Sequence, residues 1–303
     1  MLVFSHEAAL GHLTPAGHPE RVERVGAVER GLAGLVFERR EAVLADEADI
    51  LRCHPAAYLA RIRGAEPASG TVQLDPDTWM SPGCFAAASR AVGGACAAVD
   101  AVMGGGRAFV LARPPGHHAE AELPMGFCLF GTVAIAAKHA LDVCGLTRVA
   151  VVDFDVHHGN GTQALLWDEA RVRFVSSQQM PLWPGTGAAS ERGAHGQMLN
   201  LPLAPGSDGA AMRAAYDDQV FPWLEAFQPE LVLISAGFDA HADDPLAQLR
   251  WQAEDYAWLT QRLCALADRH GKGRVVSCLE GGYDLGALEA SVAAHVGALQ
   301  EQE

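Results

Sequence analysis

Acidic and imidazole side chains alternate between Asp153 and His158, in the order D-F-D-V-H-H. On an extended strand alternate side chains share a face, so Asp153, Asp155 and His157 are expected to point the same way. Three polar side chains on one face of a buried strand are costly unless a partner compensates for their burial. A divalent metal is the obvious partner, because carboxylate and neutral imidazole are both good ligands. A buried salt bridge or hydrogen-bond network is the alternative.

One strand cannot complete a mononuclear site, so a further ligand has to come from elsewhere in the chain. Asp239 is well placed for this, because it follows another apolar run at residues 231–234. Two carboxylates and one imidazole leave a coordination position open, which suits a catalytic metal rather than a structural one.

Two further features suit acid–base chemistry. His117 and His118 follow the turn R-P-P-G, and imidazole titrates near the working pH. Tyr283 follows a flexible Gly-Gly turn, from which a phenol can donate a hydrogen bond to a developing oxyanion. Taken alone, a histidine pair is at least as often a structural or surface feature as a catalytic one. Tyr283 also fits an ordinary aromatic residue in a turn.

The elements that must position these residues are short and apolar. Nearly continuous β-branched runs, typical of strands buried on both faces, occur at residues 2–4, 109–111, 149–152, 172–175, 231–234 and 275–278. Helix-like segments lie between them at residues 21–35, 86–103, 133–143, 210–227 and 256–269. This alternation predicts an α/β fold: a single domain over residues 1–303 with a doubly wound, mostly parallel sheet flanked by helices.

In such sheets ligands bind beyond the carboxyl ends of the strands. The polar candidates follow the apolar runs, as that rule requires; they are His117, His118, Asp153, Asp155, His157, Ser176, Asp239 and Tyr283. A dinucleotide or P-loop site is not supported, because neither G-x-G-x-x-G after the first strand nor a G-K-[ST] sequence occurs.

Composition limits the possible partners. The 303 residues are 50% apolar, and 22 basic against 37 acidic side chains leave a formal net charge of −15. Such a chain repels phosphate backbones, so nucleic acid is not an expected partner, whereas a cationic ligand would be attracted. No apolar run approaches the roughly 20 residues of a membrane helix, and the N-terminus lacks the features of a signal peptide. The seven cysteines are odd in number and include no C-x-x-C pair, which favours small buried residues in a reducing cytoplasm.

Five motifs together resemble the histone deacetylase superfamily, most closely its class II and bacterial amidohydrolase-like branch. They are RPPGHHA, DFDVHHGNGT, PGTG, SAGFDAHADDP and EGGYD, and they occur in the order and rough spacing of that family. The resemblance covers nearly the whole chain, from His18 to about Tyr283. It implies the arginase-deacetylase α/β fold, in agreement with the predicted sheet.

The resemblance also implies roles for the candidate residues. Asp155, His157 and Asp239 match the ligands of one catalytic zinc ion. His118 matches the general base and acid, His117 its electrostatic neighbour, Asp153 the carboxylate that pairs with His117, and Tyr283 the catalytic tyrosine. Asn160 falls where some members have an aspartate, and because an amide carries no negative charge it should leave His118 less basic.

Further matches concern a structural potassium ion and the substrate tunnel. Asp153, Asp155, His157, Ser176 and Ser177 match the potassium site. Gly126, Phe127 and Trp183 resemble the walls of a narrow tunnel for an extended acyl-amine chain. Arg21 resembles the arginine of an interior channel that receives the acid product.

The sequence thus predicts a cytoplasmic zinc amidohydrolase that removes acetyl or other short acyl groups from a small-molecule or peptide lysine-like amine. Leu246 follows Asp244-Pro245, where the polyamine-preferring branch tends to have an acid, so acyl-lysine substrates are expected to be preferred over acetylpolyamines. An acid in the segment 75–77 could still reach the tunnel rim. The alternatives are an acetylpolyamine amidohydrolase, a binuclear manganese ureohydrolase using His241, and a catalytically silent acyl-lysine binding module.

Overall fold

An eight-stranded, entirely parallel β-sheet runs through the middle of the molecule in the computed structural model, which describes residues 1–301. Its strand order is β2-β1-β5-β10-β9-β6-β7-β8. The strands are β1 (Leu2–Ser5), β2 (Glu38–Glu41), β5 (Arg107–Val110), β6 (Val149–Asp153), β7 (Val172–Gln179), β8 (Met198–Leu203), β9 (Leu231–Ala236) and β10 (Val275–Leu279). The predicted parallel, doubly wound α/β architecture is therefore confirmed.

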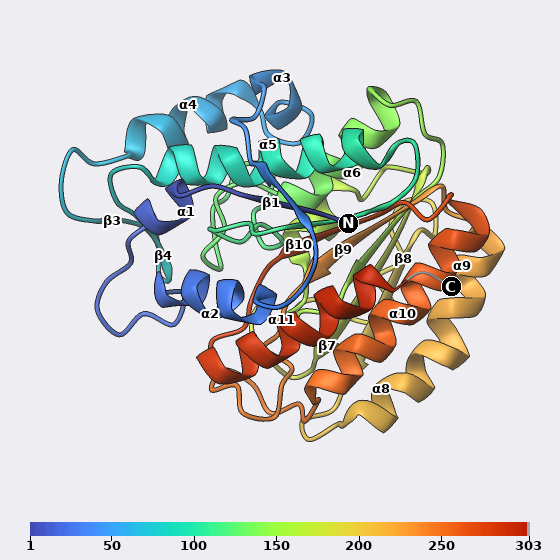
Figure 1. The fold of residues 1–303 in the computed structure, drawn as a ribbon. Coiled ribbons are helices and arrows are strands. Elements are labelled where there is room, and N and C mark those ends of the chain that lie inside the picture. Colours follow the sequence, from blue (N-terminus) through green and yellow to red (C-terminus); the bar gives the residue numbers. More distant parts are fainter. Residues whose placement is uncertain (302–303) are drawn as a thin grey trace.

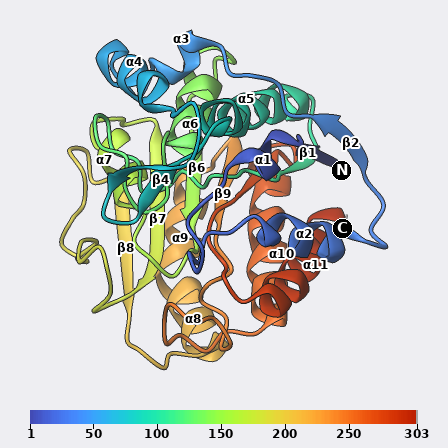
Figure 2. The ribbon, with the colours of Figure 1, turned by 90° about the vertical axis from the view of Figure 1, so that its left-hand side faces the viewer.

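Helices cover both faces of this sheet (Figure 1). One layer contains α3 (Glu47–Ile50), α4 (Ala56–Ala65), α5 (Cys84–Val102) and α6 (Thr132–Asp142). The other contains α2 (Glu23–Leu32), α8 (Gly209–Ala215), α9 (Phe221–Phe227), α10 (Ala253–His270) and α11 (Leu285–Gln300). A π-helical segment, Tyr216–Val220, joins α8 to α9, and the short helices α1 (Ala8–Gly11) and α7 (Asn160–Leu165) complete the set. The view turned by 90° shows the same two layers (Figure 2).

Two hydrophobic cores fill the spaces between the sheet and its helix layers. Because neighbouring strand residues point to opposite faces, Val151 and Leu233 pack towards α5 and α6, whereas Val152 and Ile234 pack towards α10 and α11. Both faces of the central strands are thus buried, which explains why their sequences are continuously apolar rather than alternating.

The sequence located six strands and left out the two edge strands, β2 and β8. All four residues of β2, Glu38-Arg39-Arg40-Glu41, are exposed, and charge on an edge strand prevents pairing with another chain. Pro202 lies in β8, where the outer edge of the sheet tolerates a residue without a backbone N–H. Neither strand has the apolar pattern of a central one.

Helix α5 is the one described helix that is long and apolar enough to cross a membrane. Most of its side chains are buried inside the protein, and it packs on α6 and β5. It is therefore accounted for as a core helix of the layer beside the sheet.

A two-stranded antiparallel hairpin lies outside the main sheet. It consists of β3 (Val72–Asp75) and β4 (Thr78–Met80), and its turn carries Asp77. The Asp77 side chain accepts a hydrogen bond from the backbone N–H of Gly126 at 3.1 Å, which fixes the hairpin against the loop that follows β5.

Candidate active site

The carboxyl ends of β6 and β9 bring three potential metal ligands together. Oxygen atoms of Asp155 and Asp239 and a ring nitrogen of His157 all lie within 4.8 Å of one another, and all three residues are buried. His157 Nδ1 is 3.1 Å from Asp155 Oδ1 and 3.1 Å from Asp239 Oδ2.

The local structure differs from the predicted single strand face, because β6 ends at Asp153. Asp153 Oδ1 accepts from the backbone N–H of Asp155 at 3.1 Å, and Asp155 Oδ1 accepts from that of His157 at 2.9 Å. Aspartate side chains that capture the N–H two residues on favour turns over a continued strand. Asp155 and His157 therefore come from the loop after β6, and Asp153 points to His117 instead of joining the ligand group.

The ligand group fits a cation. Burial alone would lower the pKa of His157, but hydrogen bonds to the carboxylates of Asp155 and Asp239 raise it to about 10. The two carboxylates thus concentrate negative charge at this imidazole. A Cβ atom on Gly281 would lie 2.3 Å from Asp239 Oδ2 and 2.6 Å from Asp155 Oδ2, so only glycine lets the backbone approach both carboxylates here. Two carboxylates and one imidazole are the donor set of a catalytic divalent ion.

The adjacent histidines have different partners. His117 Nδ1 lies 3.0 Å from Asp153 Oδ2, and although burial would lower the pKa of His117, the Asp155 and Asp153 carboxylates raise it well above its usual value. His118 Nδ1 lies 2.7 Å from Asn160 Oδ1, and burial together with the neighbouring His117 lowers the pKa of His118 well below its usual value. The raised pKa favours the protonated, positively charged form of His117, and the lowered pKa favours the neutral form of His118.

A cavity of about 200 Å³ leads to this group. Its wall contains His118, Gly126, Phe127, His157, Trp183, Leu246 and Tyr283, together with Asp77 and Leu182. The Trp183 ring packs edge-on against His118 with 4.7 Å between ring centroids. A Cβ atom on Gly126, whose φ is +57°, would lie 2.4 Å from the His118 ring, so this glycine allows the wall to close on the imidazole.

Tyr283 is anchored in the cavity wall by a hydrogen bond from its backbone. Its N–H donates to Asp244 Oδ2 at 2.7 Å, and the Arg24 guanidinium lies 5.1 Å from its ring centroid. Burial raises the pKa of Tyr283 well above its usual value, so the phenol stays protonated and remains a hydrogen-bond donor.

The prediction that Arg21 lies in the interior is wrong. Its side chain is exposed, at a wider cavity of about 640 Å³ formed by the loop before α2. Arg24, inside the first turn of α2, is the fully buried arginine and donates to the backbone carbonyls of Gly282 and Glu280. Arg21 precedes the helix and lies in the surface loop before its N-cap Val22, whereas Arg24 lies on the face of α2 that packs against the core.

The remaining candidates, Ser176, Ser177 and His241, each have a hydrogen-bond partner within the protein. Ser176 Oγ accepts from the backbone N–H of Gly159 at 3.4 Å, and Ser177 Oγ is 2.8 Å from the Tyr216 hydroxyl, so both serine side chains have protein partners. His241 Nδ1 accepts from the backbone N–H of Asp243 at 3.1 Å. Within residues 1–301, His241 joins no group of three metal-ligand side chains.

Sequence reasoning missed the residues that hold the site together. Glu280 is buried at the end of β10 and accepts from the backbone N–H groups of Gly116 and His117, at 2.6 and 3.1 Å. Its position directly after the apolar strand β10 is the sequence signal that could have identified it. Glu20 and Asp244 have no comparable signal, because neither directly follows a strand.

Comparison with known proteins agrees with this geometry. Residues 18–299 match the family model described as "Histone deacetylase domain". The histone deacetylase-like amidohydrolase of Pseudomonas aeruginosa is 39% identical over 284 residues, which cover 91% of this chain and 73% of that protein. A probable deacetylase of Archaeoglobus fulgidus is 37% identical over 322 residues and covers 100% of this chain and 89% of its own.

The fold is shared as well. The crystal structure of the HDA15 HD domain superimposes with a TM-score of 0.92 at 31% identity, over 100% of this chain and 91% of the other. The agreement of sequence, sheet and site leads to one assignment. This chain belongs to the histone deacetylase family, and its function is that of a deacetylase or amidohydrolase.

Proposed function

We propose that this protein is a zinc-dependent amidohydrolase, with one catalytic domain over residues 1–303, that removes acetyl or other short acyl groups from a lysine-like amine. The observation that supports it most is the placement of a neutral base, His118, and a phenol donor, Tyr283, on the wall of the cavity that ends at the carboxylate–histidine group. Asp155, His157 and Asp239 would hold the ion. When bound, zinc supplies Lewis-acid polarisation of the amide carbonyl and lowers the pKa of a water molecule.

The tautomer of His118 follows from its neighbours. Asn160 Nδ2 donates to Glu120 Oε1 at 2.9 Å, and since a carboxylate only accepts, the amide oxygen must face His118. His118 Nδ1 therefore carries the hydrogen and donates to Asn160 Oδ1 at 2.7 Å. This leaves Nε2 with a lone pair towards the cavity, which is the state that a general base requires.

The proposed reaction uses this lone pair twice. His118 Nε2 accepts a proton as water attacks the amide carbonyl carbon, and the Tyr283 phenol donates a hydrogen bond to the developing oxyanion. As the C–N bond breaks, His118 returns the proton to the departing nitrogen. The products are a carboxylic acid and the free amine. His117, hydrogen-bonded to Asp153, contributes fixed positive charge behind His118.

We also propose that Asp153, Asp155, His157, Ser176 and Ser177 surround a structural potassium ion, with the backbone oxygens of His157 and Ser177 among its ligands. The support is chemical: buried oxygen atoms suit a hard cation, and these residues belong to the end of β6, to the loop that follows it and to the neighbouring strand β7.

Metal content measured together with turnover of a fluorogenic acetyl-lysine peptide tests the main proposal. We expect purified protein to contain zinc, to lose hydrolysis on chelation and to regain it when zinc is added. Full activity without metal would overturn zinc dependence. Manganese with urea release would instead indicate the ureohydrolase, and ligand binding without turnover would indicate the silent binding module.

A further inference from the structure

A second group of metal-ligand side chains lies away from the active site, between the C-terminal ends of α5 and α6. It contains Asp100 in α5, His139 in the last turn of α6, and Cys144 just after α6. Because α6 leads into the start of β6, this group lies at the amino edge of the sheet, whereas the catalytic group lies at the carboxyl edge.

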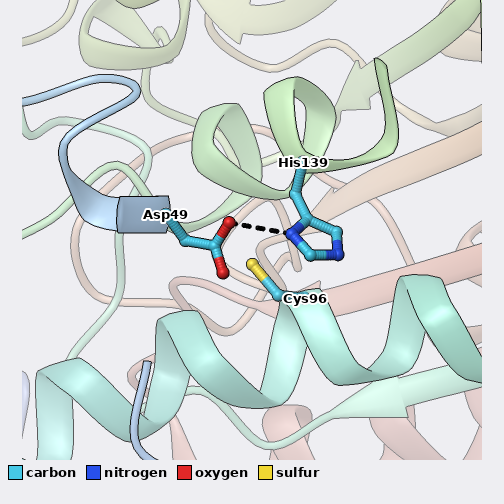
Figure 3. A group of neighbouring side chains, drawn as sticks. All are labelled: Asp49, Cys96 and His139. Carbon is cyan, nitrogen blue, oxygen red and sulfur yellow. Dashed lines mark hydrogen bonds and ion pairs between the residues drawn. The ribbon is translucent and has the colours of Figure 1, made fainter. Parts of the chain in front are cut away.

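His139 is held between two carboxylates. Its Nδ1 is 2.8 Å from Asp49 Oδ1, and its Nε2 is 3.0 Å from Asp100 Oδ1. Figure 3 shows Asp49 and Cys96 on the Nδ1 side of the ring, with the second ring nitrogen turned away from both. A carboxylate that accepts the Nδ1 hydrogen fixes the tautomer whose Nε2 lone pair can bind a metal, as in carboxylate–histidine–zinc arrangements.

Cys144 supplies a sulfur ligand on the Nε2 side. Its Sγ is 3.3 Å from Asp100 Oδ1, and the donor atoms of Asp100, His139 and Cys144 all lie within 4.8 Å of one another. In a tetrahedral zinc site with bonds of about 2.0–2.3 Å, neighbouring donor atoms are about 3.3–3.7 Å apart. The group therefore needs only small side-chain movements to surround an ion.

We propose that Asp100, His139 and Cys144 bind a second transition-metal ion of the zinc class, with water in the fourth position and Asp49 orienting His139. The donor set of carboxylate, imidazole and thiolate suits zinc and excludes calcium and magnesium, which take oxygen ligands. On binding, the ion replaces the proton on the Cys144 sulfur and any proton on His139 Nε2. The ion would tie the ends of two core helices together.

The deeper trio of Asp49, Cys96 and His139 is the less suitable place. Asp49 Oδ1 already accepts from Arg52 Nε at 3.1 Å, so its charge is neutralised by a guanidinium. Cys96 is buried in the core between α5 and α6, so an ion would have to enter the packed interior to reach its sulfur. Asp100 is exposed and Cys144 is half-buried, so an ion can reach the outer trio from solvent.

Cobalt reports on this site separately from the catalytic one, because the catalytic ligand group contains no sulfur. The full-length apoprotein is titrated with Co²⁺ and its near-ultraviolet spectrum is recorded. We expect a thiolate-to-cobalt charge-transfer band that reaches its maximum when one Co²⁺ ion per protein molecule occupies this site. The band should disappear when Zn²⁺ is added in competition. Absence of this band in the wild-type protein would overturn the proposal.

Matched variants locate the ion. We expect Cys144→Ser to abolish the band and Cys96→Ser to retain it, with circular dichroism showing that both variants fold. Asp49→Asn should keep the band but weaken cobalt affinity about 10–100-fold, which is the usual cost of losing the carboxylate behind a metal-binding histidine. A band that survives Cys144→Ser, or that only Cys96→Ser removes, would contradict the assignment.

Discussion

His118 and Tyr283 do different parts of the same reaction, and single substitutions can separate them from metal binding. Neither residue belongs to the ligand group of Asp155, His157 and Asp239, although both line the same cavity. Loss of either residue should therefore leave the metal in place while slowing the chemical step.

We predict that His118→Ala and Tyr283→Phe each lower kcat on the order of 10²-fold or more, as expected for loss of a general base or an oxyanion donor. Zinc content should stay at the wild-type value. Tyr58→Phe is the control, because it removes a different buried phenol, whose hydroxyl donates to the Leu129 carbonyl at 2.6 Å outside the cavity. A wild-type rate in either active-site variant would refute the assigned role.

At the scale of elements, one buried carboxylate joins three segments that are far apart in the sequence. Glu20, in the loop before α2, accepts from Arg24 Nη1 at 3.0 Å and from Arg113 Nε at 2.7 Å, and lies 3.3 Å from His12 Nε2. Arg113 lies in the loop after β5 that also carries His117 and His118, so the cluster anchors the loop of the catalytic histidines.

Glu20→Gln should lower the free energy of unfolding by about 3–5 kcal/mol, because it leaves buried cations without their counter-charge. Urea denaturation measures this change. Glu29→Gln is the matched control, since it breaks the exposed Glu29–Arg39 pair and should cost at most about 1 kcal/mol. Equal changes in the free energy of unfolding would show that the Glu20 cluster stabilises the protein no more than an exposed ion pair does.

The same cluster gives stability a pH dependence. Burial lowers the pKa of His12, but hydrogen bonds to Cys84 and Glu20 raise it from 6.5 to about 9. A pKa raised in the folded state stabilises the protein fully below pH 6.5, and this contribution is lost as the pH rises through about 9. The stability gap between wild type and His12→Gln should therefore narrow between pH 6.5 and pH 9 in urea unfolding. A constant gap would contradict the shifted pKa.

The central strands could be predicted from the sequence, whereas the edge strands and the residues that hold the active site in place could not. Continuous apolar runs located β6 and β9, and the rule that sites lie at strand ends then located Asp153, Asp155 and Asp239. Helix α11 was not predicted because its own alanine and other apolar side chains lie on all of its faces. The one-sided apolar pattern of a surface helix is therefore absent from its sequence. Contacts such as Glu280 to the backbone of Gly116 join residues 164 positions apart, and no local pattern encodes them.

At the scale of the whole molecule, the net charge of −15 attracts cations diffusely, whereas selection between substrates depends on the cavity rim. Two residues of opposite character, Leu246 and Asp77, line the cavity. An acid from the β3–β4 turn thus does reach the cavity. Asp77 Oδ1 is already occupied by hydrogen bonds from the Gly126 backbone N–H and the Thr78 hydroxyl, which leaves less of its charge available to a ligand.

We therefore predict a higher kcat/KM for an acetyl-lysine peptide than for N8-acetylspermidine, because a second ammonium finds the apolar Leu246 and a carboxylate that is partly satisfied. Leu246→Glu should raise kcat/KM for the polyamine about 2–5-fold, the size expected for a partly exposed ion pair of about 0.5–1 kcal/mol, and should leave the peptide value nearly unchanged. Leu246→Gln is the control for polarity without charge, and added salt should erase the gain of the glutamate variant. If the wild-type protein favours N8-acetylspermidine and Asp77→Asn removes that advantage, Asp77 is the ammonium partner and the predicted preference is wrong.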